Sequence, residues 1–243
     1  MRTYDAAVSI PCELERARHL ALASDETTAK ALLLSLMPQI EEADRDDWML
    51  EALAQLGELY LVRTAYEGVR EGALRIRECL AIYSSILAGT AAPDVVAKST
   101  MTPVEVRHLI CRYRRRAGFL ETGLAAAIGD HEGAAVALSA LDDGDDEFAD
   151  LAEEHAYLLS YARIVCAEAL CDDDLHVRSV PLWDSVIQHI ESSSGSSESA
   201  DNLRVLGGIG YARFCIETGR LDQAAPWLRR AEARAEARGW ELA

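Results

Sequence analysis

The sequence has few of the residues that break helices or build strands. Its 243 residues include only 6 prolines and 15 glycines, and runs of β-branched residues are scarce. A chain rich in β-structure needs such runs, so their scarcity argues against a sheet. Alanine and leucine are abundant instead, which favours helices. Hydrophobic residues make up 50% of the chain, which is ample for a core and excludes a disordered chain.

Long apolar runs are also missing. The longest, such as residues 31–34, are far shorter than a membrane span, and residues 1–15 lack the apolar stretch of a secretory signal. We therefore expect a cytoplasmic chain without a membrane partner. In that compartment the six cysteines are expected to be reduced thiols, mostly buried in helices: Cys12, Cys79, Cys111, Cys166, Cys171 and Cys215.

Positive charge is in short supply. The chain has 24 lysines and arginines against 41 acidic residues, a formal net charge of -17. Phosphates repel such a surface, so general binding to nucleic acid or to an anionic membrane is disfavoured. The plainest meaning of the charge is solubility. The other meaning is a basic or amphipathic partner, attracted for example to the acids of 142–146.

Catalytic and metal-binding motifs are absent as well. Cys166 and Cys171 do not form a C-x-x-C pair, the histidines include no H-E-x-x-H, and the acidic run 142–147 lacks the order of a calcium loop. The glycines of 206–210 follow no strand, so they do not indicate a phosphate loop. Cys111 lies among arginines, but no histidine with a supporting acid is identifiable by spacing. We predict no enzymatic activity, no metal and no cofactor.

What the sequence does contain is a series of amphipathic helix pairs. Apolar residues recur every three or four positions, which is typical of helices with one buried face. The pattern predicts an all-α fold of about ten helices in stacked antiparallel pairs, an α-solenoid or compact array. The whole of 1–243 is expected to form a single helical-repeat domain. A subdivision into 1–88 and 102–243 is the alternative, with flexible loops at 88–102 and 191–200, the first of them containing one helical turn around 94–97. The predicted pairs are 12–43, 47–87, 103–141, 147–190 and 201–237.

Prolines and capping residues predict some helix boundaries. Thr102, Pro103 and Glu105 have the order of a capping residue, a proline at the first helical position and an acid three residues after the cap. Pro38 falls inside a helical pattern, so a kink or break is expected there. Pro181 lies inside the helix predicted over 177–190 and would be easiest to place if that helix started near residue 180.

Two stretches resemble the tetratricopeptide-repeat family. Residues 53–60 are similar to the W-x-x-L-G-x-x-Y first helix of that family, with Leu53 in the Trp place, Gly57 in the Gly place and Tyr60 in the Tyr place. This pair departs from the pattern at Val69, where alanine is usual.

The second stretch lies near the end of the sequence. Gly219 resembles the turn glycine of the family, and the small, large and small positions of the second helix match Ala224, Leu228 and Ala231. In that register Ala212 takes the close-packing place, and Cys215 replaces the aromatic. A weaker match places Gly129, Ala134 and Leu138 in a third pair. The spacing between pairs varies, unlike the strict period of the family.

The resemblance implies a function in binding. Arrays of this family bind peptides or protein surfaces, usually on the concave face lined by the first helices. They act as chaperone adaptors, assembly scaffolds or the sensing parts of bacterial regulators. These uses follow from the resemblance and not from the periodicity.

The most unusual local feature is a cluster of five arginines in residues 107–116. Guanidinium groups bind carboxylates and phosphates bidentately, so the cluster could clamp an acidic ligand. Internal pairing with Glu41, Glu42, 142–146 or Glu153 is the alternative. The candidate binding residues are Arg107, Arg112, Tyr113 and Arg114, with Tyr60 and Arg63 on the neighbouring pair.

Two functions therefore remain open. The first is a protein-binding or peptide-binding scaffold or adaptor without catalytic activity. The second is a regulatory domain that senses a small acidic molecule or peptide in an arginine-lined concave pocket. The sequence leaves homo-oligomerisation open.

Overall fold

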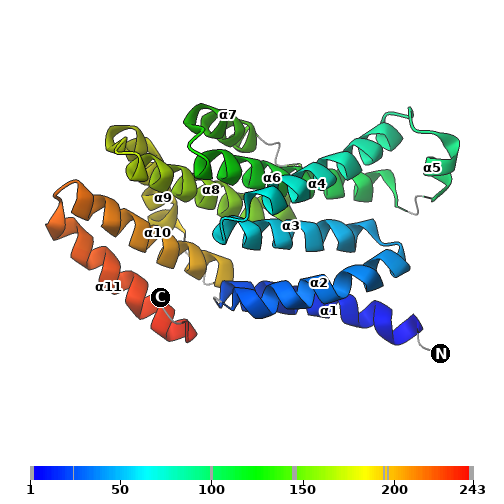
Figure 1. Cartoon of the computed structure of the whole chain (residues 1–243), viewed down its shortest axis with the longest axis horizontal. Coiled ribbons are helices and arrows are strands. Elements are labelled where there is room, and N and C mark those ends of the chain that lie inside the picture. Colours follow the sequence, from blue (N-terminus) through cyan, green and yellow to red (C-terminus); the bar gives the residue numbers. More distant parts are fainter. Residues whose placement is uncertain are drawn as a thin grey trace. The chain divides into compact units, whose positions relative to one another are not determined.

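The computed structural model describes residues 3–23, 25–98, 101–143, 147–193, 195 and 197–240. Within these residues all regular structure is helical and no strand is present (Figure 1). The all-α prediction is therefore confirmed. The helices are α1 (Thr3–Leu22), α2 (Glu26–Ala43), α3 (Asp46–Val62), α4 (Tyr66–Leu87), α5 (Pro93–Lys98), α6 (Pro103–Ala127), α7 (His131–Asp142), the 3-10 helix η1 (Ala149–Leu151), α8 (Ala152–Asp172), α9 (His176–Ser192), α10 (Glu198–Glu217) and α11 (Leu221–Arg238).

Four helix pairs turn in the same way. The turns of α3–α4, α6–α7, α8–α9 and α10–α11 each place one residue in the left-handed region: Thr64, Gly129, Asp174 and Gly219 respectively. The next residue then donates its backbone N–H to the carbonyl five positions earlier, at 2.7–2.9 Å. The last three turn residues are equally spaced along the chain, 45 residues apart. The pairs are thus built on one local geometry, although only two of the four turns have a glycine.

The buried positions around these turns correspond as well. The residue seven positions before the turn residue is small and buried in each pair, which lets the paired helices approach closely. The residues five and twelve positions after it are buried too. The three sets, in chain order, are Gly57, Thr122, Ala167 and Ala212; Val69, Ala134, Ser179 and Ala224; and Ile76, Leu141, Val186 and Ala231.

The chain divides into two compact units. The first unit is Met1–Ala21, Glu26–Glu121 and Asp143–Ala152, and the second is Leu22–Asp25, Thr122–Asp142 and Glu153–Ala243. The main division falls inside α6, whereas segment 88–102 lies within the first unit. The single repeat domain expected from the sequence stays a prediction.

The core of the first unit is formed by α1, α2 and α3, and α4 packs against α3. Fully buried aliphatic side chains such as Ile10, Leu33 and Leu50 fill it. Gly57 is needed for a close approach, because a Cβ built on it would lie 2.6 Å from Cδ1 of the buried Leu120. Its small size is therefore a packing requirement.

The core of the second unit centres on Trp183 of α9. The Trp183 ring stacks on Phe214 of α10 with centroids 6.2 Å apart. Around this pair, α8, α9, α10 and α11 contribute buried residues such as Ile164 and Ala224. In Figure 1, α10 and α11 fold back on each other as an antiparallel pair.

The expected helix starts and breaks had mixed outcomes. The capping box at α6 is confirmed, since Thr102 N–H donates to Glu105 Oε2 at 2.7 Å and Glu105 N–H donates to Thr102 Oγ1 at 3.3 Å. Of the kink or break expected at Pro38, the break is wrong, because α2 runs through this residue. The helix predicted over 177–190 is confirmed, because α9 begins at His176, and it carries Pro181 in its interior. Packing of the flanking buried residues outweighs the missing proline N–H in both helices.

The two segments predicted as flexible loops contain more helix than expected. Segment 88–102 includes α5, near the helical turn expected within it, and residues 99 and 100 lie outside the described part. In the serine-rich stretch, Ser197 caps α10 by accepting the Ala200 N–H at 3.2 Å. Residues 194 and 196, like 144–146 of the acidic run, also lie outside the described part.

Candidate functional site

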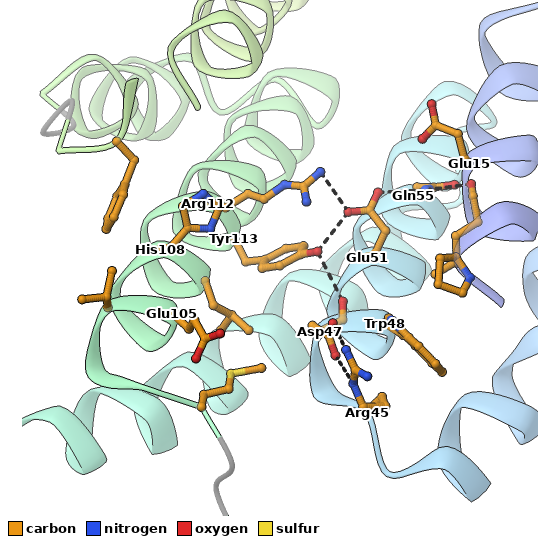
Figure 2. A pocket seen from close by; sticks show the side chains of 16 residues that line it. Glu15, Arg45, Asp47, Trp48, Glu51, Gln55, Glu105, His108, Arg112 and Tyr113 are labelled. Atoms are coloured by element: carbon orange, nitrogen blue, oxygen red, sulfur yellow. Dashed lines mark hydrogen bonds and ion pairs between the residues drawn. The ribbon is translucent and has the colours of Figure 1, made fainter. Parts of the chain in front are cut away.

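The first unit contains a cavity of about 790 Å³. Side chains of α1, α3 and α6 form most of its wall, with Met101 before α6 and Phe148 before η1 (Figure 2). A volume of this size is within the range of ligand pockets. The apolar part of the wall consists of Pro11, Leu14, Trp48, Met101, Val104, Leu109 and Phe148, and the polar part of Glu15, Arg45, Asp47, Glu51, Gln55, Glu105, His108, Arg112 and Tyr113.

Glu51 is the centre of the polar wall. Its Oε1 accepts from Arg116 Nη1 at 2.7 Å and from Gln55 Nε2 at 2.8 Å. Its Oε2 lies 3.0 Å from the Tyr113 hydroxyl and 3.3 Å from Arg112 Nη2 (Figure 2). Burial alone would raise the pKa of Glu51. The charges of Arg116 and Arg112, with hydrogen bonds from Gln55 and Arg116, outweigh burial and lower the pKa to about 2. Glu51 is therefore ionised at neutral pH.

Arg116 is tied to α3 at two places. Besides Glu51, it contacts Glu58 Oε1 through both Nε and Nη2, at 3.2 and 2.7 Å. Its side chain is only 6% exposed. A buried guanidinium needs such carboxylates, because a charge without a partner in the interior is costly. Arg116 thus links α6 to α3 and does not line the cavity.

The Tyr113 hydroxyl has two acceptors within reach. In addition to Glu51 Oε2, the Asp47 carbonyl oxygen lies 3.3 Å from it. Burial, followed by the charge of Glu51, raises the pKa of Tyr113, so the hydroxyl stays protonated and donates to one of them at a time. Tyr113 therefore serves as a fixed donor in the wall.

Arg45 and Asp47 form a pair on the α3 side of the cavity. Nε and Nη2 of Arg45 donate to the two carboxylate oxygens of Asp47 at 2.8 and 2.7 Å. The same guanidinium lies over the Trp48 ring, 4.5 Å from its centroid. This bidentate, stacked geometry holds Arg45 in place.

His108 lies on the opposite side, on α6. Its Nε2 is 2.7 Å from Asp150 Oδ2, and its ring meets Phe148 edge-on with centroids 5.0 Å apart. The hydrogen bond to His108 lowers the pKa of Asp150. These contacts connect the cavity wall of α6 to the segment that leads into η1.

The charges of the wall favour cations over anions. Four carboxylates line the cavity (Glu15, Asp47, Glu51 and Glu105), against two arginines, Arg45 and Arg112. Both arginines already contact a carboxylate of the wall. Among the described residues, Oε1 of the buried Gln55 has no hydrogen-bond donor, while its Nε2 donates to Glu51 and to the Leu14 carbonyl. The wall therefore presents acceptors more than donors.

Of the six binding residues predicted from the sequence, two line the cavity and four do not. Arg112 and Tyr113 line the cavity. Arg107 pairs with Glu147 at 3.1 Å, and Arg114 is exposed. Arg63 contacts Glu26 at 3.0 Å and Thr27, and the Tyr60 ring lies 4.5 Å from Lys30 Nζ. The internal partners of the arginine cluster include Glu51, Glu58 and Glu147. Pairing with the acidic run 142–146 stays a prediction, since residues 144–146 lie outside the described part.

Sequence reasoning missed the acidic half of this site. Glu51 and Gln55 stand four residues apart in a helix whose other residues from 50 to 57 are apolar or glycine. Polar residues with that spacing on a buried helix could have indicated a polar network. The pairing of Glu51 with Arg116 is long-range, and periodicity does not reveal it.

No family model, curated protein or solved structure matches the chain. Within the described residues, no helix has both the length and the apolarity to cross a membrane. The same residues include no group of three or more His, Cys, Asp or Glu side chains placed to hold a metal ion.

Proposed function

We propose that this chain is a non-catalytic binding protein whose first unit takes up a protein or peptide segment that is amphipathic and carries a basic side chain. The observation that carries the proposal is the composition of the cavity wall. One part is apolar and aromatic, and the other holds four carboxylates against two arginines, which pair with Asp47 and Glu51, so two carboxylates are in excess. A basic side chain on an apolar segment complements both parts.

An acidic ligand fits this wall less well. It would have to draw Arg112 from Glu51 or Arg45 from Asp47, and it would approach the carboxylates Glu15 and Glu105. Like charges that face each other at an interface weaken binding by roughly several kcal/mol. The cavity therefore favours the binding of a peptide segment with basic residues over the sensing of a small acidic molecule.

The repeated turns support the tetratricopeptide-like part of the proposal. The four helix pairs share a left-handed turn residue and buried small residues at corresponding positions. The resemblance seen in the sequence rested on some of these positions, among them Gly57, Ala212 and Ala224. Helix pairs of that family present peptide-binding surfaces, which agrees with a cavity between first helices such as α3 and α6.

We propose no catalytic role for the cysteines. Burial raises the pKa of Cys79 and of Cys166 to about 12, and it is also the main reason why the pKa of Cys215 is raised. Thiols in such surroundings are rarely ionised at neutral pH, so they are poor nucleophiles. Cytoplasmic localisation, in which these thiols stay reduced, is part of the same proposal.

The test is a selection of random dodecapeptides displayed on phage, with the purified full chain as target. The proposal predicts that enriched peptides contain arginine or lysine together with leucine, phenylalanine or another large apolar residue. Enrichment of acidic peptides would contradict it and favour the acidic-ligand alternative. No enrichment over the starting library would contradict peptide binding altogether.

A further inference from the structure

A second cavity lies within the second unit, among arginines that the sequence analysis did not single out. Its volume is about 520 Å³. Arg204 of α10, and Trp227, Arg230 and Arg234 of α11, form much of its wall, and Ile190 of α9 adds an apolar side chain. Figure 1 shows these three helices in the later part of the chain.

The arginines are organised by one buried carboxylate. Asp201 is 2% exposed, and its Oδ1 accepts from Arg204 Nη1 at 2.9 Å and from Arg234 Nη1 at 3.0 Å. Its Oδ2 accepts from Arg238 Nε at 2.8 Å. Burial alone would raise the pKa of Asp201, but hydrogen bonds from Arg238 and Arg204 and the charge of Arg234 lower it. One negative charge thus holds three guanidinium groups in fixed positions.

Arg204 is fixed further by the chain that precedes α10. Its Nη2 donates to the Ser193 carbonyl oxygen at 2.7 Å, and its side chain is only 14% exposed. A guanidinium held by two different acceptors loses little freedom when it binds a third group. Arg204 is therefore preorganised toward the cavity it lines.

Arg230 has a different environment. Its guanidinium lies over the Trp227 ring, 5.0 Å from the centroid, and it makes no ion pair with any residue that the structure describes. The ion pairs that join α11 to α10 at Asp201 come from Arg234 and Arg238 and do not involve Arg230. The positive charge of the cavity wall thus exceeds what the ion pairs of Asp201 use.

The charge balance contrasts with that of the whole chain. Around this cavity stand the positive charges of Arg204, Arg230, Arg234 and Arg238, against the carboxylates of Asp201 and Glu191. The chain as a whole carries a formal net charge of -17. A local excess of arginine on such an acidic chain is where a small anion would concentrate.

From this arrangement we infer that the second unit binds a small organic anion, with its carboxylate or phosphate group on Arg204, Arg230 and Arg234 and its flat apolar part against Trp227 and Ile190. Arginine forks match both oxyanions bidentately, and the aromatic ring provides a surface for a planar group. The volume suits a small molecule and not a folded partner. This site is separate from the cavity proposed to bind peptides and does not depend on it.

Three probes test the inference: phenyl phosphate, benzoate and the neutral benzyl alcohol. Each is titrated into the full chain labelled with 15N, and the indole N–H resonance of Trp227 is followed, assigned through Trp227→Phe. We expect saturable shifts with at least one anion and none with benzyl alcohol. Saturation by phenyl phosphate alone identifies the phosphate as the recognised group, and saturation by benzoate alone identifies the carboxylate.

Arg230→Gln and Arg229→Gln form the matched pair of variants. Arg229 is the exposed neighbour on α11 and does not line the cavity. Arg230→Gln is expected to raise the Kd of the bound anion by about tenfold, because one charged contact is lost. Arg229→Gln is expected to keep the wild-type Kd. Equal effects of the two variants would overturn the inference. The inference would also be overturned if no saturable Trp227 shift appeared at about 10 mM anion, because a minimal site is expected to have a Kd below this concentration.

Discussion

Arg116 Nη1 lies 2.7 Å from Glu51 Oε1, and the two side chains are 6% and 14% exposed. The pair joins α6 to α3 in the first unit, next to the cavity that Glu51 lines. A buried pair of this kind contributes less than its Coulomb attraction suggests, but the loss of one partner leaves an uncompensated charge. The stability of the first unit and the shape of its cavity therefore depend on the same contact.

Replacing Glu51 with glutamine is expected to lower the free energy of unfolding by about 3 kcal/mol, because Arg116 stays buried with less compensation. Urea denaturation measures this change. Glu71→Gln is the control, since the Glu71–Arg75 pair is well exposed, and it is expected to change stability by less than about 0.5 kcal/mol. Similar losses in both variants would show that the Glu51 network is not special.

Glu51 also makes the free energy of unfolding depend on pH. The ordinary pKa of 4.5 applies to Glu51 in the unfolded chain, and the folded value is about 2. The unfolded state binds the proton more readily, so the contribution of Glu51 is present above pH 4.5 and is lost as the pH falls through about 2. The difference between wild type and Glu51→Gln should shrink over that window. A difference that is constant from pH 6 to pH 2 would contradict the lowered pKa.

Glu168 of the second unit has the opposite pH dependence. Burial, only partly offset by the charge of Arg213, raises its pKa from 4.5 to about 7. The folded state therefore binds the proton more tightly, and the favourable contribution of the protonated form is lost as the pH rises from 4.5 through 7. Glu168→Gln should match wild type at pH 4 and be more stable at pH 8, by at most about 3 kcal/mol.

Thermal or urea unfolding at the two pH values checks this prediction. Glu232→Gln removes the same charge from an exposed position of α11 and serves as the control. A stability gain for Glu168→Gln that is equal at pH 4 and pH 8 would mean that the carboxyl group does not titrate between them.

Gly57 tests the close packing of α3. In Gly57→Ala the new Cβ would lie 2.6 Å from Leu120 Cδ1, so buried side chains must move, at a cost of about 1–3 kcal/mol. Gly72→Ala in α4 is the control, because its Cβ would lie 3.5 Å from the Leu53 carbonyl oxygen, an ordinary contact. That variant should be neutral or more stable by up to about 1 kcal/mol, from helix propensity. A stable Gly57→Ala would contradict the packing requirement.

The repeated turn makes a paired prediction of opposite sign. Thr64 and Gly219 occupy the same left-handed position, with φ of 56° and 75°, but only glycine does so without strain. Thr64→Gly should stabilise the chain by about 1 kcal/mol, and Gly219→Ala should destabilise it by a similar amount. No atom lies within 4 Å of a Cβ built on Gly219, so sterics from neighbours do not enter. Changes of the same sign in both variants would contradict the common geometry.

Sequence periodicity was sufficient for the helices and most of their turns. The apolar spacing predicted an all-α fold in pairs, and the capping box at Thr102 and the turn at Gly219 were recognisable from their residues. The left-handed conformation of Thr64 was not, because threonine disfavours it; tertiary packing of the paired helices imposes it.

The candidate sites were only partly predictable. The arginine cluster drew attention to Arg112 and Tyr113, which do line a cavity. Its chemical meaning depends on Glu51, whose pairing with α6 bridges distant parts of the sequence. The second cavity was missed for the same reason, because Asp201 and Arg234 stand far apart in the sequence and look like ordinary exposed charges.

The central claim is that the cavity of the first unit binds a basic, amphipathic peptide. Its most direct test is the fluorescence anisotropy of a selected, labelled peptide with two variants of the chain. Val104→Trp enlarges a side chain of the cavity wall, and Val62→Trp enlarges an equally exposed valine that does not line the cavity (54% and 53% exposed). We predict that Val104→Trp weakens binding by at least about tenfold, or 1.4 kcal/mol, and that Val62→Trp leaves it unchanged. Equal affinity of the peptide for wild type and Val104→Trp would contradict the claim.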